Sequence, residues 1–384
     1  MKKIVERIFY FSYLAINLFL FLLLWIISPI LKKRGKQNGI LALPYTPKDW
    51  PGGYDRMDAW TNMFFTDGVN YHVDYAWKKV DFELFHSISI TTFKRYLIFS
   101  KILVHRIRLL FSFKNYETIW IQRAFLPMFP YKDAYFEKLL ARIHPHIIYD
   151  FYDADYASNY KLVMSTVAAA KKVTVATEYL RSKFISVNKE TYLLRYAIDT
   201  KSFKVRANTN SDIIRIGWMG SPGNAINLMA IEEQLQTLES EFSNIQFSFL
   251  CRNFPSLNLK KLHKNSWSDA QFDYYEWLST LDIGIVPFIK ADERTKAKVS
   301  MKGLEFMAQG IPIAASPFIH SDQLENGISF LLTEQHFWYD NLKKLVLDKE
   351  LRIRMGQQAE IIFDSFHTYK IVYKDFKEIV KLDI

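Results

Sequence analysis

The chain has 384 residues, 49% hydrophobic and 23% charged, with a net charge of +10 and a single cysteine, Cys251. This length predicts two domains or one large one, and the composition excludes a disordered or low-complexity chain. One cysteine excludes a disulfide scaffold and a cysteine-rich zinc module. Residues 1–36 and 94–114 each carry a net charge of +6, which leaves −2 for the rest. Because no nucleic-acid-binding motif accompanies this charge, we expect no nucleic-acid partner.

The N-terminal segment contains 24 consecutive residues without a charge, from Ile8 to Leu31. About 20 such residues in a helix are enough to cross the hydrocarbon core of a bilayer. A cleaved signal peptide is the alternative, but its apolar region has about 7–15 residues and ends at a small-residue cleavage site. The sequence therefore favours an uncleaved membrane anchor over residues 1–36. The anchor either spans the membrane or lies in it as an element broken at Pro29.

Strand and helix patterns alternate after the anchor. Strand-like runs occur at 39–45, 118–122, 146–151 and 172–177, a loop is expected at 46–56, and helical patterns occupy 132–143 and 160–170. This alternation predicts a parallel α/β architecture.

Residues 91–111 have the periodicity of an amphipathic helix, with apolar residues such as Phe99 and Leu103 on one side and Lys94, Lys101 and Arg108 on the other. Two interpretations remain open. The helix has an ordinary solvated face, or residues 94–114 form a patch that binds an anionic membrane surface.

The pattern restarts after a polar segment at 200–212, which we interpret as a domain linker. Strands are expected at 213–219, 245–251, 281–288 and 311–316, a loop at 220–224, and helices at 225–242 and 301–309. Two successive α/β halves predict two Rossmann-like domains, residues 37–205 and 206–362, that face one cleft.

Each half has one glycine-containing segment at or soon after the end of its first strand. Gly52 and Gly53 allow close backbone approach to a ligand or form a structural turn, and Arg56 is suited to an anion. Residues 217–224, GWMGSPGN, close a strand and open a helix, where a phosphate is favoured. This segment is neither a dinucleotide-binding fingerprint nor a Walker A loop.

A third segment places Lys298, Lys302 and Glu305 along one helical face or its entry loop. The plain alternative is a solvated charge cluster. However, apolar residues flank Glu305, and a Gly-x-Pro turn at Gly310 leads into a strand that has a buried pattern.

Residues 298–316 resemble the signature of group 1 (family four) glycosyltransferases of the GT-B fold, in a variant subset with two lysines. Further similarity lies at 281–287, at 217–221, and in the first half at 51–56, 121–123 and 149–154, and the motifs keep the family's order over about residues 40–375. The resemblance implies a GT-B architecture in which a helix at about 365–381, within a C-terminal segment of residues 363–384, packs back on the N-terminal domain.

The resemblance also implies roles for individual residues. Glu305 would hold the ribose of a nucleotide-sugar, and Lys298 would meet its diphosphate, with help from the backbone of Gly220 and Ser221. The other expected ligand-binding residues are Gly217, Lys302, Gly52, Gly53 and Arg56. Ala297 stands where the commoner family pattern has a first glutamate. The family generally retains anomeric configuration and does not usually need a metal.

Three aspartates near the end of the strand at 146–151 have alternative interpretations. Asp153 and Asp155 formally make a D-x-D triplet, which binds Mn²⁺ in another glycosyltransferase fold, but such a triplet is short enough to arise by chance. Asp150 or Asp153 would orient an acceptor hydroxyl, or they are structural. We expect no bound metal and no cofactor besides the nucleotide-sugar co-substrate.

The sequence thus predicts a membrane-anchored glycosyltransferase whose catalytic domains lie on the cytoplasmic face, where nucleotide-sugars are made. The acceptor would be a lipid-linked or surface glycan in bacterial polysaccharide or glycolipid synthesis. Residues 8–31, and in one interpretation 94–114, would contact the membrane. The alternative, favoured by Ala297, is a degenerate relative that binds glycan or lipid and scaffolds a synthesis complex.

Overall fold

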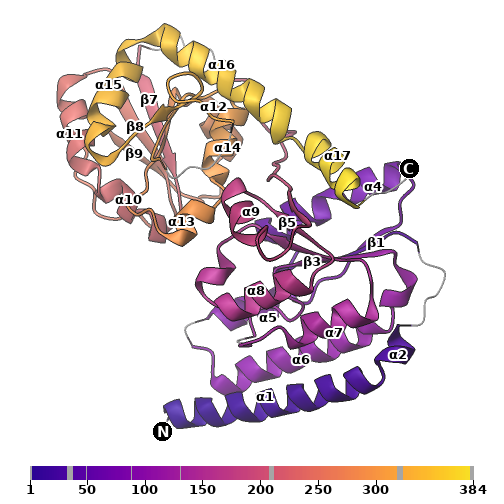
Figure 1. The fold of residues 1–384 in the computed structure, drawn as a ribbon. Coiled ribbons are helices and arrows are strands. Elements are labelled where there is room, and N and C mark those ends of the chain that lie inside the picture. Colours follow the sequence, from indigo (N-terminus) through magenta and orange to yellow (C-terminus); the bar gives the residue numbers. More distant parts are fainter. Residues whose placement is uncertain are drawn as a thin grey trace. The chain divides into compact units, whose positions relative to one another are not determined.

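The computed structural model describes residues 2–32, 38–48, 50–87, 89–129, 131–206, 212–317 and 323–380. The chain forms two compact units: unit 1 is Met1–Tyr196 with Tyr373–Ile384, and unit 2 is Ala197–Val372. Each unit contains one six-stranded parallel sheet with helices around it (Figure 1). Parts of the segments at 1–36 and 200–212, and all of 381–384, lie outside the described residues.

The sheet of unit 1 has the strand order β2-β1-β3-β4-β5-β6, and all its pairs are parallel. Its strands are β1 Ile40–Leu43, β2 Tyr71–Val73, β3 Thr118–Gln122, β4 Ile147–Phe151, β5 Lys172–Val175 and β6 Thr191–Leu193. Every residue of β1, β3 and β4 is buried, as continuous apolar runs predict for a parallel sheet. The strand order reverses between β1 and β3, which creates a switch point at their carboxyl ends.

The helices of unit 1 include one turn that the sequence did not predict. They are α1 Lys2–Ile26, α2 Ser28–Leu31, α3 Pro51–Arg56, α4 Thr61–Thr66, α5 Lys79–His86, α6 Thr92–Leu110, α7 Tyr135–Ile143, α8 Tyr160–Ala169, α9 Glu178–Phe184 and α17 Tyr369–Val380, with short 3-10 turns at Asp58–Trp60, Phe113–Asn115 and Asp155–Ala157. The expectation of a loop throughout 46–56 was wrong, because Pro51 occupies the first turn of α3, where its missing N–H costs nothing. Helix α1 lies beside α6 and α7 (Figure 1).

The last helix, α17, belongs to unit 1 from Tyr373 onward and packs there. The ring of Phe376 lies 4.1 Å from that of Trp120 and 5.3 Å from that of Trp60, and all three side chains are buried. The Asp67 carboxylate, which follows α4, accepts hydrogen bonds from Tyr373 Oη (2.8 Å) and Lys377 Nζ (2.7 Å). Aromatic packing and an ion pair therefore attach the end of the chain to residues more than 200 positions earlier.

The sheet of unit 2 has the order β12-β11-β10-β7-β8-β9, again with parallel pairs. Its strands are β7 Ile214–Met219, β8 Ile245–Leu250, β9 Leu262–Asn265, β10 Ile283–Val286, β11 Ile313–Ala315 and β12 Leu331–Leu332. The chain builds β7, β8 and β9 in one direction and then places β10 on the other side of β7. The switch point of this sheet therefore lies at the carboxyl ends of β7 and β10.

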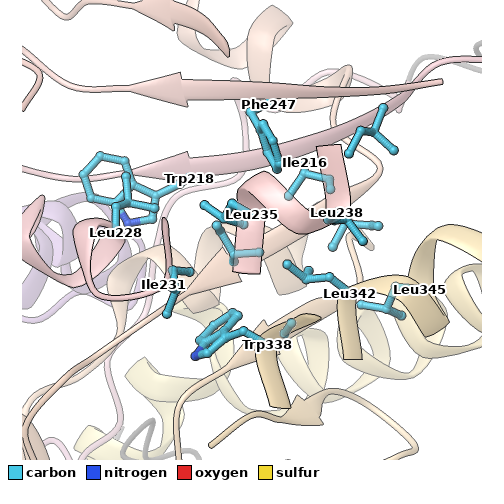
Figure 2. Packing of buried hydrophobic residues seen from close by; sticks show 14 of the residues in the cluster. Ile216, Trp218, Leu228, Ile231, Leu235, Leu238, Phe247, Trp338, Leu342 and Leu345 are labelled. Atoms are coloured by element: carbon cyan, nitrogen blue, oxygen red, sulfur yellow. The ribbon is translucent and has the colours of Figure 1, made fainter. Parts of the chain in front are cut away.

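The helices of unit 2 differ from expectation at one place. They are α10 Ile226–Met229, α11 Glu232–Glu241, α12 Tyr274–Ser279, α13 Glu293–Ala297, α14 Met301–Ala308, α15 Trp338–Leu347 and α16 Lys349–Phe366, with 3-10 turns at Pro222–Asn224 and Gln335–Phe337. The single helix expected at 225–242 is broken at Ile231, which leaves helical geometry (φ −116°, ψ 11°). The break lets both Leu228 and Ile231 enter the core beside Leu235 (Figure 2).

The core of unit 2 joins the sheet to α11 and α15. Trp218 and Phe247 come from neighbouring strands, Leu235 and Leu238 from α11, and Trp338 from α15, and all are buried in one cluster (Figure 2). This packing leaves the carboxyl ends of the strands as the polar edge of the sheet.

Candidate functional site

A cavity of about 300 Å³ lies at the switch point of unit 2. Its lining comes from the segment after β7, with Asn224 and Asn227, and from the segment after β10, residues 288–298. Because ligands of open parallel sheets bind at this type of crevice, the cavity is the strongest candidate site in unit 2.

The charged residues that line this cavity are mostly basic. They include Lys290, Arg294 and Lys298, against a single carboxylate, Asp292. Asp292 has a structural role, since its side chain accepts a hydrogen bond from the backbone N–H of Thr295 (2.8 Å) and caps α13. Three cations around one hollow fit an anionic group such as a diphosphate.

Lys298 was predicted here, whereas Lys290 and Arg294 were not. Lys298 forms the C-cap of α13 and is exposed. The preceding residue, Ala297, is fully buried, so the position where the common family pattern has a glutamate points into packed protein. Sequence reasoning missed the other two cations because they lie outside the motif and only the fold of the 287–298 segment brings them to the cavity.

Glu305 lies on α14, whose first turn is capped by Ser300 Oγ accepting the N–H of Gly303 (3.1 Å). Its carboxylate lies 3.8 Å from Lys302 Nζ, and the Glu305 side chain is 19% exposed. Atom Oε2 is the oxygen that faces Lys302 in this long ion pair, and it is buried without a hydrogen-bond partner among the residues that the structure describes. A buried acceptor without a donor is costly, so this oxygen is poised for a donor from a ligand.

The environment of Glu305 changes its protonation. Burial raises the pKa of the Glu305 carboxyl above its usual value, while Lys302 and the Tyr274 hydroxyl act in the opposite direction. Burial and the nearby Glu305 in turn raise the pKa of Tyr274 well above its usual value, so its hydroxyl stays protonated. That hydroxyl lies 3.3 Å from Met219 Sδ at the end of β7, which connects Glu305 to the switch point.

The glycine segment after β7 has a packing role at two positions. A side chain at Gly217 would collide with Leu281, and one at Gly220 would collide with the Trp218 ring. The Gly220 N–H donates to Leu250 O (3.0 Å) and extends the sheet. Ser221, which is exposed, begins the short turn that leads to the cavity. The structure therefore accounts for both glycines by close packing, and phosphate contacts at Gly217, Gly220 and Ser221 stay predictions.

In unit 1, Arg56 and Asp150 bind one another and are both buried. Arg56 Nε donates to Asp150 Oδ2 (3.0 Å), and Arg56 Nη2 donates to Oδ1. Thr174 Oγ1 also donates to Asp150 Oδ1 (2.7 Å), and Arg56 Nη1 donates to the carbonyl oxygens of Leu194 and Arg195 (2.9 and 3.0 Å). These bonds give both residues a structural role within unit 1. A ligand contact of Arg56 and an acceptor-orienting role of Asp150 stay predictions.

The glycines of α3 allow the helix to approach the sheet closely. The Gly52 carbonyl accepts a bond from Gln122 Nε2 (2.7 Å), and a side chain at Gly52 would meet the Tyr152 hydroxyl. A side chain at Gly53 would meet Thr46. Close packing against the segments that follow β1 and β4 thus explains both glycines without a ligand.

Arg123 is the polar centre at the carboxyl end of β3; the sequence pointed to it only as part of the similarity at 121–123, without a role. It has φ +62°, a strained conformation for a residue with a side chain. Its guanidinium donates to Asp155 through Nε (2.8 Å), lies 3.6 Å from Asp153, and packs over the rings of Tyr45 and Tyr152. Both carboxylates of the D-x-D triplet therefore face an arginine.

Metal ligands are not gathered anywhere in the described part of the chain. No group of three or more His, Cys, Asp or Glu side chains there has the geometry to hold a metal ion.

Comparisons with known proteins give matches in structure alone. No protein-family model and no curated protein sequence matches the chain. A glycosyltransferase from Rickettsia africae aligns over 91% of this chain and 100% of its own, with 12% identity and a TM-score of 0.64. Sucrose-phosphate synthase from Thermosynechococcus elongatus aligns over 89% and 98%, with 12% identity and a TM-score of 0.59. HepE from Anabaena, solved with UDP, aligns over 89% and 99%, with 12% identity and a TM-score of 0.57.

These similarities establish the fold class. The chain has the GT-B architecture, two Rossmann-like units with parallel sheets, and an apolar N-terminal helix precedes the first sheet. The prediction of this fold is confirmed.

Proposed function

We propose that the protein is a glycosyltransferase that moves a sugar from a nucleotide-sugar to a lipid-linked or surface-glycan acceptor. The GT-B architecture supports this proposal, and so does the ligand bound to one structural neighbour, HepE with UDP. The observation that carries it is the buried Oε2 of Glu305 near the switch point of unit 2, which has a long ion pair with Lys302 but no hydrogen bond from the residues that the structure describes.

Glu305 would accept hydrogen bonds from the ribose hydroxyls of the nucleotide. Hydrogen bonds to a charged group contribute about 1.5–3 kcal/mol each. A ribose presents two adjacent hydroxyls, which match the two oxygens of one carboxylate. Lys302, 3.8 Å away, would keep the carboxylate ionised when the nucleotide is bound.

The basic cavity would hold the diphosphate. A cation 4 Å from a phosphate gains about 4 kcal/mol at an effective dielectric of 20, before desolvation. Negative charge grows on the diphosphate as the sugar departs, so Lys298 and Arg294 would stabilise the transition state more than the ground state. This role needs no acid–base group at the position of Ala297.

The two-lysine subset, retention of configuration and a metal-free reaction remain parts of the proposal. So do an acceptor that is membrane-bound, attachment through residues 8–31 and 94–114, and catalytic units on the cytoplasmic face. Helix Ile4–Ile26 is long and apolar enough to cross a membrane, with a mean hydropathy of 2.1.

The competing proposal is a scaffold that binds glycan or lipid without catalysis. It is favoured by Ala297, whose buried side chain leaves no first glutamate in the site. The two proposals differ in what Glu305 must do, since a scaffold has no need for a nucleotide.

A binding experiment on the full-length protein in detergent tests the proposal. Thermal unfolding is measured with UDP, GDP, ADP or CMP and their sugar conjugates. A ligand present at 100 times its dissociation constant adds about 2.7 kcal/mol of stability. We expect one nucleotide class to stabilise the wild type and not Glu305→Ala.

Glu233→Ala is the matched control, because Glu233 is an exposed glutamate on α11 of the same unit. It should respond to the nucleotide as the wild type does. If no nucleotide stabilises the wild type, or if both variants respond alike, the donor site proposed here is wrong and the scaffold proposal takes precedence.

A further inference from the structure

Helix α1 is attached to unit 1 along its whole length. Near its start, the Phe9 ring stacks on Tyr96 of α6 (5.8 Å), and in its middle Tyr131 Oη donates to Asn17 Oδ1 (2.7 Å). Towards its end, Arg142 of α7 lies over the Trp25 ring (4.6 Å) and donates from Nε to Ser28 Oγ (2.8 Å). Tyr13 against Tyr96 and Phe21 against Tyr135 lie between these contacts, so a contact recurs every four residues and one face of the helix is fixed to the protein.

The contacts of this fixed face include buried polar groups. Asn17 and Ser28 are each 1% exposed, and their partners are Tyr131 and Arg142. Detaching α1 would leave these groups without partners in a hydrocarbon environment, which is costly.

The opposite face of α1 is apolar and exposed. Its large exposed side chains are Ile4, Val5, Ile8, Phe11, Ile16, Phe19, Leu22, Leu23 and Ile26, and Ile30 of α2 continues the series. Helix α6, beside it in Figure 1, adds Phe93, Leu97, Val104 and the following Phe111. So many large apolar side chains exposed on one face indicate an interaction surface for a membrane or a partner.

Basic side chains accompany this apolar surface. Lys94, Arg95, Lys101 and Arg108 of α6 are exposed, and Arg7 is exposed on α1. A groove of about 620 Å³ lies between the two helices, with Arg7 and Arg95 and the aromatic rings of Tyr10, Phe11, Tyr96 and Phe99 in its lining, together with Glu6. Cations and aromatic rings next to an exposed apolar face are complementary to the headgroups and chains of anionic lipids.

We infer that α1 does not cross the membrane but lies in the plane of one leaflet, and that the groove between α1 and α6 holds the phosphate of an anionic lipid. A transmembrane orientation would carry the attached α6 into the hydrocarbon core together with Lys94, Lys101 and Arg108. An in-plane orientation buries the apolar face and leaves these cations at the headgroup level. The inference rests on the membrane association proposed above, but not on the transferase activity.

A topology experiment on the full chain tests the orientation. The protein is made in bacterial cells with one epitope tag at each end, and a protease is added to spheroplasts or to inverted membrane vesicles. An in-plane α1 places both tags on the same side of the membrane, so both are cleaved in one preparation and protected in the other. A spanning α1 places the tags on opposite sides, and this result would overturn the inference while leaving membrane association intact.

A vesicle experiment tests the surface itself. Purified protein is floated with vesicles of phosphatidylcholine alone or of phosphatidylcholine and phosphatidylglycerol in equal parts. We expect Phe19→Lys/Ile26→Lys to abolish most flotation with both vesicle types. The matched control is Phe65→Lys, because Phe65 is 83% exposed in unit 1 but lies on α4. Equal loss in the control would refute the assignment of the surface.

The groove is tested with Arg7→Gln/Arg95→Gln. Loss of two lipid-facing charges should weaken binding to the anionic vesicles by about thirtyfold, with little change on phosphatidylcholine. Lys201→Gln/Lys349→Gln removes two exposed charges of unit 2 and should leave the preference for anionic vesicles unchanged. An unchanged preference in the arginine variant would exclude the groove as the phosphate site. No flotation of the wild type with any vesicle would reject membrane docking altogether.

Discussion

Asp150→Asn is the substitution that best separates a structural carboxylate from a catalytic one. The change keeps the size of the side chain but removes its charge. Asp150 is fully buried and accepts bonds from Arg56 and Thr174, so the variant leaves the buried Arg56 guanidinium without its counter-ion. We therefore expect loss of stability rather than a selective loss of chemistry.

The magnitude follows from the burial of both partners. Removing one member of a buried ion pair typically costs 3–5 kcal/mol. For a protein or unit of about 200 residues, each kcal/mol shifts the melting temperature by about 2–4 °C, so the expected decrease is roughly 6–20 °C. The pair joins residues 94 positions apart, so the effect should be on unit 1 as a whole rather than on a local segment.

Urea and thermal unfolding of the full-length protein, followed by tryptophan fluorescence, measure this effect. The partner variant Arg56→Met should also destabilise, and the double variant should cost less than the two single costs added together, with a coupling of up to about 3 kcal/mol. Asp153→Asn is the control, because Asp153 is 39% exposed and lies 3.6 Å from Arg123. Its expected cost is below about 1 kcal/mol.

One result would refute this reasoning. If Asp150→Asn unfolds at the wild-type temperature and binds nucleotide normally but loses turnover, then Asp150 acts on the acceptor. The sequence-based prediction of a catalytic Asp150 would then be right, and the interpretation of the buried pair would be wrong.

Three further predictions concern packing and protonation. Phe376→Ala should lower the free energy of unfolding by about 3–5 kcal/mol in urea titrations, because this fully buried ring of α17 packs on Trp60 and Trp120; an effect below 1 kcal/mol would mean that α17 is not held in this way. Gly356→Ala should lower the melting temperature markedly, because its new methyl group would lie 2.0 Å from the carbonyl oxygen of Gly310, and a normal melting temperature would contradict this close approach. The raised pKa of Glu305 means that the folded state holds its proton more tightly than the unfolded state. Its stabilising contribution is complete below the usual pKa of 4.5 and is lost as pH rises through the folded value, so Glu305→Gln should flatten the wild-type stability profile across that window; parallel profiles would exclude the shift.

The central strands could be predicted from the sequence because a strand that is buried on both faces is a continuous run of apolar residues. The strand at 118–122 was expected from a continuous apolar run, and β3 occupies those residues. Short edge strands such as β2 and β12 could not be predicted in this way, since three or two residues are too few to show an apolar run or an alternating pattern. The prediction of a single helix at 225–242 was wrong for a different reason. The local pattern is helical, but the packing of Ile231 in the core interrupts the helix.

Charge was harder to place than hydrophobicity. Arg106 was counted in the basic segment 94–114, but it is fully buried, 3.1 Å from Asp74 and over the ring of Phe125. Burial lowers its pKa to about 10 despite the neighbouring carboxylate. The sequence does not show that Arg106 has an ion-pair partner, Asp74, which lies 32 residues earlier in the loop after β2. Because Arg106 is buried, the surface of the segment 94–114 is less basic than its composition indicates.

In the candidate site, too, some residues could be found from the sequence and others only from the fold. Lys298, Lys302 and Glu305 lie close together in the sequence and could be found from one motif. Tyr274 reaches Glu305 from another helix, and Arg123 depends on a positive φ, so neither contact has a local sequence signal.

Glu305 and Asp150 are both acids near the carboxyl ends of parallel strands, yet their surroundings assign them different tasks. Asp150 has both oxygens occupied by donors from its own unit, so its charge is already compensated and a ligand could bind it only by displacing Arg56 or Thr174. Glu305 has one oxygen without a donor, and burial raises its pKa although Lys302 lies 3.8 Å away. Because an unpaired buried acceptor costs free energy that a ligand hydroxyl would recover, binding energy is available at Glu305 and not at Asp150. In this fold, the acid that still has an oxygen without a hydrogen bond is therefore the better guide to the ligand than the acid whose oxygens are all occupied.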